Sequence, residues 1–122
     1  MTVDDIVRLL DLQPHPTEGG YFVETHRTAE TVPAHALPDR YAGDRAHGTA
    51  IYYLLTADTF SALHRLASDE VFHFYLGDPV EQLQLFPGGE GRTVVLGTDL
   101  AAGQRPQQIV HQIVWVAQKR LK

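Results

Sequence analysis

Apolar residues change their spacing along this chain, and the change predicts one short helix followed by a series of strands. Near the N-terminus an apolar stripe of helical period follows Thr2 and Asp5, which together resemble a capping box. This pattern predicts a helix over residues 3–11. Residues 21–28 are rich in aromatic and β-branched side chains and predict a strand, whereas residues 29–48, with two prolines, predict one long loop.

Beyond residue 48, short apolar runs alternate with turns that contain Gly, Pro, Asp or Ser. The strands predicted from these runs cover residues 49–55, 59–66, 71–76, 81–86, 92–97 and 108–116. Their spacing of roughly 8–12 residues is typical of an all-β sandwich or barrel. Because the sequence contains no visible linker and no internal repeat, residues 1–122 are predicted to form a single domain.

The composition narrows the functional classes that this fold could serve. The 122 residues contain no cysteine, which excludes disulfides, thiolate nucleophiles and zinc sites built on cysteine. The formal net charge is −5 and no basic stripe occurs, so a nucleic-acid partner is not expected. No apolar run approaches the roughly 18 residues of a membrane-spanning helix, and the acidic N-terminus differs from a secretion signal. The sequence therefore predicts a cytoplasmic protein without a membrane partner.

A histidine and a glutamate lie on two neighbouring predicted strands. If both strands alternate regularly, His64 shares a face with Phe60, and Glu70 shares a face with Phe72 and Phe74. Burying a carboxylate costs on the order of several kcal/mol unless it is paired, and proteins that carry this cost often use the group. His64 and Glu70 are therefore candidate catalytic residues, and the two phenylalanines are candidate ligand contacts. In the alternative interpretation, Glu70 caps a turn and remains hydrated.

Five other residues could contribute to a pocket. If Tyr53 is buried, its hydroxyl needs a partner, which a pocket would provide. His73 and Tyr75 have the opposite parity on their strand and would need a bulge to face inward; a packed or interface histidine is the alternative. Thr25 and Arg27 share one face of an earlier strand, and Arg27 could bind an anion through two hydrogen bonds unless it is simply exposed. We expect catalytic roles for Tyr53 and Tyr75, and ligand-binding roles for Thr25, Arg27 and His73.

Three blocks of the sequence, in order, resemble one branch of the cupin superfamily. The blocks are Glu18–Thr25, which contains Glu-Gly-Gly-Tyr-Phe and Glu-Thr; Ala50–Leu55, which reads Ala-Ile-Tyr-Tyr-Leu-Leu; and Phe60–Pro79. In the third block His64, Glu70 and Gly77 match the first cupin motif, while Leu66 stands where that motif has a second histidine. The branch is catalogued as a cupin-like domain of unknown function, the cupin-5 type, and the resemblance extends from about residue 6 to residue 108.

The resemblance implies a double-stranded β-helix, a jelly-roll barrel with a pocket in its mouth that is usually dimeric. Sugar-nucleotide epimerases of the dehydrorhamnose type share this scaffold, work without metal, and use a histidine base with a tyrosine acid. By this resemblance His64 is the expected base, helped or oriented by Glu70, and Tyr53 or Tyr75 is the expected acid. Family members continue beyond the point where this chain stops. The barrel is therefore expected to be C-terminally shortened, with an exposed edge that favours a homodimer.

The sequence departs from the cupin pattern at the positions that usually hold a metal. Cupins take two histidines and a glutamate from the first motif and a histidine from a second, Pro-x-Gly-x-x-His. Here Leu66 replaces one histidine of the first motif; in the second, His111 replaces the proline, Ile113 the glycine and Val116 the last histidine. These departures predict that both the turn and the fourth ligand are lost. No metal ligands and no cofactor are therefore assigned, and a divalent metal stays an alternative.

The sequence thus predicts a protein that binds a small polar molecule. The leading activity is a metal-independent isomerase or epimerase acting on a sugar-like or nucleotide-linked substrate. One alternative is a binding module that holds its ligand between Phe72, Phe74 and Tyr53 without chemistry. Another is a metal-dependent enzyme such as a dioxygenase, and a third is a remnant without function that is stable only as an oligomer. Fold alone does not decide among these functions.

Overall fold

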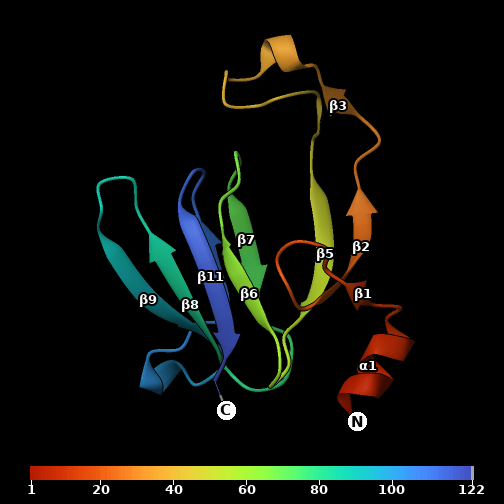
Figure 1. Ribbon diagram of the computed structural model, residues 1–122, viewed down its shortest axis with the longest axis vertical. Helices are drawn as coiled ribbons and strands as arrows, with labels where there is room; N and C mark the ends of the chain where they lie inside the picture. The colour runs from red at the N-terminus through yellow and green to blue at the C-terminus, as the bar shows by residue number, and fades with distance from the viewer. Residues whose placement is uncertain (122) are drawn as a thin grey trace. The chain divides into compact units, whose positions relative to one another are not determined.

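The computed structural model describes residues 1–121, which form mostly β-structure with one short helix (Figure 1). The chain divides into two compact units. Unit 1 contains residues 1–15 and 21–54, and unit 2 contains residues 16–20 and the chain from residue 55 onward. Within residues 1–121 the hydrogen-bonded strands form four separate sheets that do not close into a ring. No helix in this part of the chain is long and apolar enough to cross a membrane.

The helix of unit 1 begins where the sequence predicts it. Helix α1 (Val3–Leu9) is capped by Thr2, whose hydroxyl accepts from the amide of Asp5 at 3.2 Å. The carboxylate of Asp5 accepts in return from the amide of Thr2 at 2.9 Å, which completes the capping box. The helix is shorter than predicted at its end, where Asp11 has a positive φ of 57° and turns the chain out of the helical path.

The first sheet of unit 1 has the order β1-β2-β5. Its strands are β1 (Gln13–Pro14), β2 (Tyr21–Arg27) and β5 (Thr49–Leu54). The register between β2 and β5 shifts between Glu24 and His26, which marks a bulge at Thr25. Because a bulge interrupts regular alternation, simple alternation no longer assigns Thr25 and Arg27 to one face.

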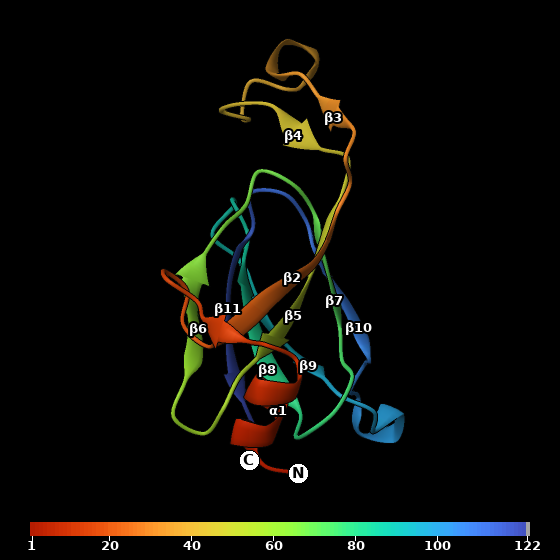
Figure 2. The same cartoon turned by 90° about the vertical axis from the view of Figure 1, so that its right-hand side faces the viewer.

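The segment predicted as one long loop contains a small hairpin. Strands β3 (Thr31–Val32) and β4 (Arg45–Ala46) pair antiparallel, as Figure 2 shows, and a 3-10 turn, η1 (Ala34–Ala36), lies between them. The carboxylate of Asp44 accepts from the amide of Ala34 at 2.8 Å and ties the two sides together. Strands of two residues leave no hydrophobic period to detect, so the sequence pattern could not reveal this hairpin.

The main sheet of unit 2 has four antiparallel strands in the order β6-β11-β8-β9 (Figure 1). They are β6 (Phe60–His64), β11 (Trp115–Arg120), β8 (Val80–Leu85) and β9 (Gly91–Leu96). A second pair, β7 (Glu70–His73) with β10 (Gln107–Val110), forms a separate two-stranded sheet (Figure 2). A 3-10 turn, η2 (Leu100–Ala102), precedes β10. The predicted strands over residues 49–97 are thus present, with bounds that differ by a few residues.

The predicted strand over residues 108–116 is two strands, β10 and β11, joined by a turn. The amide of Val114 donates to the carbonyl of His111 at 3.2 Å, and Ile113 adopts a φ of 60°. The amide of Gln112 donates to the carboxylate of Asp69 at 2.8 Å, which fixes the turn from outside. The expectation that Ile113 removes the turn is therefore wrong. The turn forms with a β-branched residue in a conformation that glycine adopts more easily.

The four-stranded sheet has a buried face and an open face, and the strand register assigns residues to each. The buried face carries Ser61, His64, Gln82, Gln84, Val116 and Gln118, and the open face carries Phe60, Glu81, Leu83, Trp115, Ala117 and Lys119. Val116 joins Val110 and Val114 in the apolar core of unit 2, against which Phe72 and Phe86 pack. Gln82 has no exposed surface, whereas Phe60 is 63% exposed.

A chain of hydrogen bonds links the three glutamines of the buried face; we call it the glutamine chain. The Nε of Arg92 donates to Gln84 at 3.0 Å, the amide of Gln84 donates to Gln82 at 2.6 Å, and that of Gln82 donates to Gln118 at 3.1 Å. A guanidinium can only donate, so Arg92 fixes the direction of every amide after it. The glutamines can be buried because each of these amides has found a partner.

A register shift between β6 and β11 decides which way His64 faces. Phe60 lies opposite Lys119 and Ser61 opposite Gln118, but His64 lies opposite Val116. One extra residue on β6 therefore brings Ser61 and His64 to the same face. The expectation that His64 shares a face with Phe60 is wrong, because it assumed an uninterrupted alternation.

Candidate functional site

His64 lies at the end of β6, directly opposite Val116 on β11. Its side chain is largely buried, at 15% exposure, on the face that also carries the glutamine chain. The Nδ1 atom lies 2.7 Å from the carbonyl oxygen of Ala62, which can only accept a hydrogen bond. Nδ1 therefore carries a proton, and Nε2 is the atom left to face the rest of the site.

The Nε2 atom of His64 lies 2.9 Å from Oε1 of Glu18, within hydrogen-bond distance. An ionised carboxylate also only accepts, so this contact needs a proton between the two atoms. With both ring nitrogens facing acceptors, His64 and Glu18 together hold two protons, and the arrangement is that of an imidazolium paired with a carboxylate. Burial by itself lowers the pKa of His64, but the bond to Glu18, the carbonyl of Ala62 and the charges of both glutamates outweigh it and raise the pKa.

The short segment Pro16–Gly20 carries Glu18 to this position. The carbonyl of Glu18 accepts from the amide of Ala62 at 2.6 Å, so the segment lies along β6. Gly19 has a φ of 91°, and a Cβ there would overlap the carbonyl oxygen of Phe60. Glycine is required for both reasons, the backbone conformation and the close approach. The glycine beside Glu18 thus lets the backbone come near enough for the carboxylate to reach His64.

Glu70, the first residue of β7, is the third member of the group, which we call the His64 cluster: Glu18, His64 and Glu70. Its Oε1 lies 3.9 Å from Nε2 of His64, close enough for charge attraction but too long for a hydrogen bond. Burial raises the pKa of Glu70; the charge of His64 opposes that effect and the charge of Glu18 adds to it. The cluster thus combines one imidazole ring, whose two nitrogens both face acceptors, with two carboxyl groups in a partly desolvated setting.

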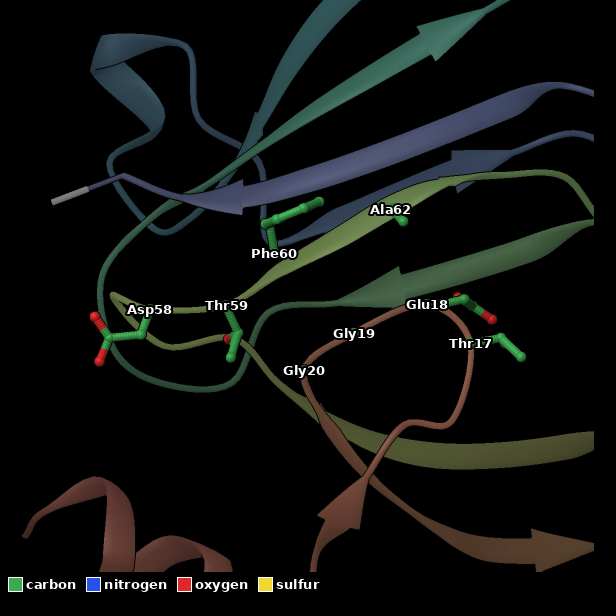
Figure 3. Close-up of a pocket in the computed structure, with 8 residues that line it drawn as sticks. All are labelled: Thr17, Glu18, Gly19, Gly20, Asp58, Thr59, Phe60 and Ala62. Atoms are coloured by element: carbon green, nitrogen blue, oxygen red, sulfur yellow. The ribbon is translucent and has the colours of Figure 1, made fainter.

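A hollow of about 330 Å³ lies beside the segment that holds Glu18. Its lining residues are Thr17, Glu18, Gly19, Gly20, Asp58, Thr59, Phe60 and Ala62 (Figure 3). In Figure 3 the side chains of Glu18 and Thr17 lie on the side away from Asp58. The hollow therefore borders the backbone of the Glu18 segment, while the carboxylate is committed to His64.

The site residues predicted on β7 and just after it do not all face the same way. Phe72 and Phe74 are half-buried, and Phe72 packs on the apolar core. His73 is exposed, as simple alternation predicts, and its ring stacks on Tyr75 at 6.4 Å between centroids. Tyr75 is 67% exposed. The structure therefore brings His64 and Glu70 together, and it places His73 on the opposite face of β7 from Glu70.

Three predicted site residues belong to unit 1. The hydroxyl of Thr25 donates to the carbonyl of Ala50 at 3.2 Å. Arg27 is exposed and forms an ion pair with Glu24 at 2.7 Å, which raises the pKa of the guanidinium. Tyr53 is half-buried, with its ring 6.2 Å from that of His15. Their roles in a ligand site shared with the His64 cluster stay predictions.

Sequence reasoning missed Glu18 as a member of the site, because alternation relates only residues of one strand or of neighbouring strands. Glu18 lies in the Gly-rich segment that was assigned to a turn, far along the chain from His64. One signal was present: Glu18 opens the first block of the cupin resemblance, with two glycines directly behind it. A carboxylate next to a glycine that the backbone requires was the signal that could have pointed to Glu18.

The side chains at this position do not fit the usual metal site of the cupin pattern. Both ring nitrogens of His64 already face acceptors, and Val116, opposite His64, is apolar at the position of the last histidine. Leu66 is apolar at the position of the second histidine. Within residues 1–121 no group of three or more His, Asp or Glu side chains is arranged to hold a metal ion.

Comparison with known proteins adds a family and several relatives. A family model described as "Cupin superfamily (DUF985)" matches residues 4–122. The uncharacterized protein YML079W of Saccharomyces cerevisiae is 28% identical over 98 residues, which cover 76% of this chain and 49% of the yeast protein. This chain thus spans about half the length of that curated relative.

Two solved structures are similar to the fold. A hypothetical protein from Leishmania major has a TM-score of 0.86 and 29% identity, with 98% of this chain and 70% of that chain covered. Protein SO0799 from Shewanella oneidensis has a TM-score of 0.87 and 31% identity, with 100% of this chain and 71% of that chain covered. The names of these relatives describe no activity.

Proposed function

Because the chain belongs to the cupin superfamily, in the branch described as DUF985, we propose that it binds a small polar molecule at the His64 cluster. The observation that carries this proposal is a histidine ring held between two carboxyl groups in a largely buried position. Charged groups are expensive to bury, and perturbed titratable groups gather where proteins bind or transform ligands. The double-stranded β-helix belongs to the same proposal, and the antiparallel pairing of all the strand pairs described above supports it.

The activity that we propose for this site is a metal-independent isomerisation or epimerisation. Such reactions move a proton from one position of the substrate to another, and the cluster supplies proton-carrying groups without a metal ligand set. A tyrosine acid, Tyr53 or Tyr75, would complete the pair that the cupin resemblance implies. The glutamine chain on the same face of the sheet adds polar side chains that are held rigidly by hydrogen bonds to one another.

A screen for ligands, followed by product analysis, tests this proposal. Neutral sugars, sugar phosphates, nucleotide sugars and amines would be added singly, and the melting temperature would be recorded. We expect at least one class to raise it, since a ligand that binds the folded state stabilises it. Glu70→Gln should reduce the shift, whereas Glu81→Gln, the same change on the open face, should leave it unchanged. If no class shifts the wild-type protein, the proposal fails.

A binding module without chemistry is the second function that one observation favours. Both ring nitrogens of His64 are already engaged, so the cluster is stable without a substrate to complete it. Nuclear magnetic resonance of the recovered ligand separates the two functions. An interconverted ligand supports the isomerase, and a ligand recovered unchanged after long incubation supports the binding module.

We propose a homodimer formed through the open face of the four-stranded sheet. Phe60 and Leu83 are exposed there beside a hollow of about 290 Å³, and exposed apolar patches commonly mark interfaces. Glu81 and Lys119 form an ion pair at 3.5 Å on the same face, so a copy related by a two-fold axis would present the opposite charge to each. Sedimentation should give the mass of a dimer for the wild type and of a monomer for Phe60→Asp. A monomeric wild type would contradict the proposal.

A further inference from the structure

The three members of the His64 cluster differ in how far their hydrogen-bonding capacity is used. His64 is fully engaged, with acceptors at 2.7 Å and 2.9 Å from its two ring nitrogens. Glu18 holds one of those contacts through Oε1 and is fixed by its backbone bond to Ala62. The side chain of Glu70 makes no hydrogen bond within residues 1–121, and its Oε1 lies 3.9 Å from Nε2 of His64. Glu70 is therefore the member with acceptor capacity to offer.

Three basic groups of unit 2, among the residues that the structure describes, are committed to partners outside the cluster. The guanidinium of Arg65 lies 4.9 Å from the ring centre of Trp115, on the open face. The guanidinium of Arg92 donates to Gln84 at the start of the glutamine chain. His111 lies 3.7 Å from Asp69. One histidine ring thus faces two carboxyl groups, and an added anion would meet a site that is already rich in acceptors.

We infer that the ligand is received at Glu70 through a hydroxyl or amine group that donates a hydrogen bond, and that carboxylate and phosphate groups are excluded. The His64–Glu18 pair keeps its proton and its position, and the ring of His64 attracts the carboxyl group of Glu70. This inference rests on the proposed function, because it takes the His64 cluster as the binding site. It changes the role expected from the cupin resemblance: Glu70, and not His64, supplies the acceptor atom for the ligand.

The position of the protons can be measured on the protein alone. In a sample labelled with ¹⁵N and ¹³C, His64 should show two protonated ring nitrogens at pH 7.5, and the Glu70 carboxyl should titrate as a separate group. Glu18→Gln should convert His64 to a ring with one proton at that pH, while Glu81→Gln should leave it doubly protonated. A neutral His64 in the wild type at pH 7.5 would overturn the inference.

The ligand class can be tested with two small probes of similar size and opposite charge. Ethylammonium and acetate would be titrated at constant ionic strength while the Glu70 carboxyl signal is followed. We expect ethylammonium to move this signal more than that of Glu81, and acetate to leave Glu70 and His64 unchanged. A response of His64 to acetate, or a Glu70 that responds no more than Glu81, would contradict the inference.

The two proposals can fail independently. A ligand from the thermal screen should bind Glu70→Gln at least about tenfold more weakly than wild type, because a hydrogen bond to a charged acceptor is lost. A ligand that binds this variant as tightly as wild type overturns the role of Glu70 and leaves the proposed function standing. If no ligand binds the wild type, the proposed function fails, while the proton positions are still read from the labelled protein.

Discussion

The two faces of the four-stranded sheet in unit 2 carry opposite kinds of side chain, and the distribution is the reverse of what hydropathy leads one to expect. On the buried face, Gln82 and Gln84 have almost no exposed surface. On the open face of the same strand, Leu83 is 38% exposed and lies near Phe60 and Ala117. A sheet with one face in water normally buries its apolar side.

The difference teaches that polar side chains can fill the buried face of this sheet beside Val116 when they bond to one another. The amides of the glutamine chain are mutually satisfied and anchored by Arg92, so burial leaves none of these bonds unmade. The apolar residues of the open face are left for another surface to cover. The predictions below test this comparison, from the largest expected effect on stability to the smallest.

Gln82→Leu should destabilise the protein by about 3 kcal/mol, although leucine is the more apolar residue. The substitution removes a donor and an acceptor at the centre of the glutamine chain, so Gln84 and Gln118 each lose a partner while buried. Urea denaturation followed by circular dichroism measures the change in the free energy of unfolding. A variant as stable as wild type would show that the buried face does not depend on its hydrogen bonds.

Ile113→Gly should stabilise the protein by about 1 kcal/mol, because a β-branched residue is strained at a φ of 60°. The turn joins β10 to β11 and carries no side chain of either face of the sheet. Thermal unfolding should show a higher melting temperature with unchanged ligand binding. A loss of stability would mean that the side chain of Ile113 contributes more through contacts than its backbone conformation costs.

Glu70→Gln should change how stability depends on pH. A carboxyl whose pKa is raised by folding binds more protons in the folded state, so stability falls as the pH rises above its ordinary value of 4.5. Glutamine does not titrate, so the variant should gain stability relative to wild type between pH 4 and pH 7. His64, whose pKa is also raised, should give a further decline above pH 6.5 in both proteins. Parallel curves for the two proteins between pH 4 and pH 7 would contradict this prediction.

Leu83→Gln should have the smallest effect, below about 0.5 kcal/mol for the monomer, since the side chain is exposed on the open face. It is the matched partner of Gln82→Leu, one residue along the same strand and on the other side. Denaturation at a protein concentration where sedimentation shows only monomer is the appropriate measurement. If both variants lose the same stability, the two faces do not differ in the way proposed here.

The sequence predicted the elements of this fold better than their faces. Turns rich in glycine and proline delimit the strands from residue 49 to residue 97, so their positions follow from local signals. The division between β10 and β11 does not, because Ile113 and Val114 are residues of high strand propensity that here form a turn.

The site was predictable in part, for a related reason. His64 and Glu70 lie on neighbouring strands, and the structure places them 3.9 Å apart. The regular alternation that was expected for His64 is broken by the register shift opposite β11. Glu18 joins through a contact distant in sequence, made possible by the close approach of Gly19 to Phe60. No periodic pattern encodes either event.

The register shift in β6 has a consequence for how this segment can vary. Ser61 and His64 face the same side because one residue more than regular pairing requires stands between them. Deleting Ala62 or Leu63 would remove this extra residue, and regular alternation would then keep the histidine on the face of Ser61, opposite Val116. For the gene, a codon lost here is therefore compatible with the orientation of the histidine. The residue that His64 pairs with on β11, more than its distance from Ser61 along the chain, places it in the cluster.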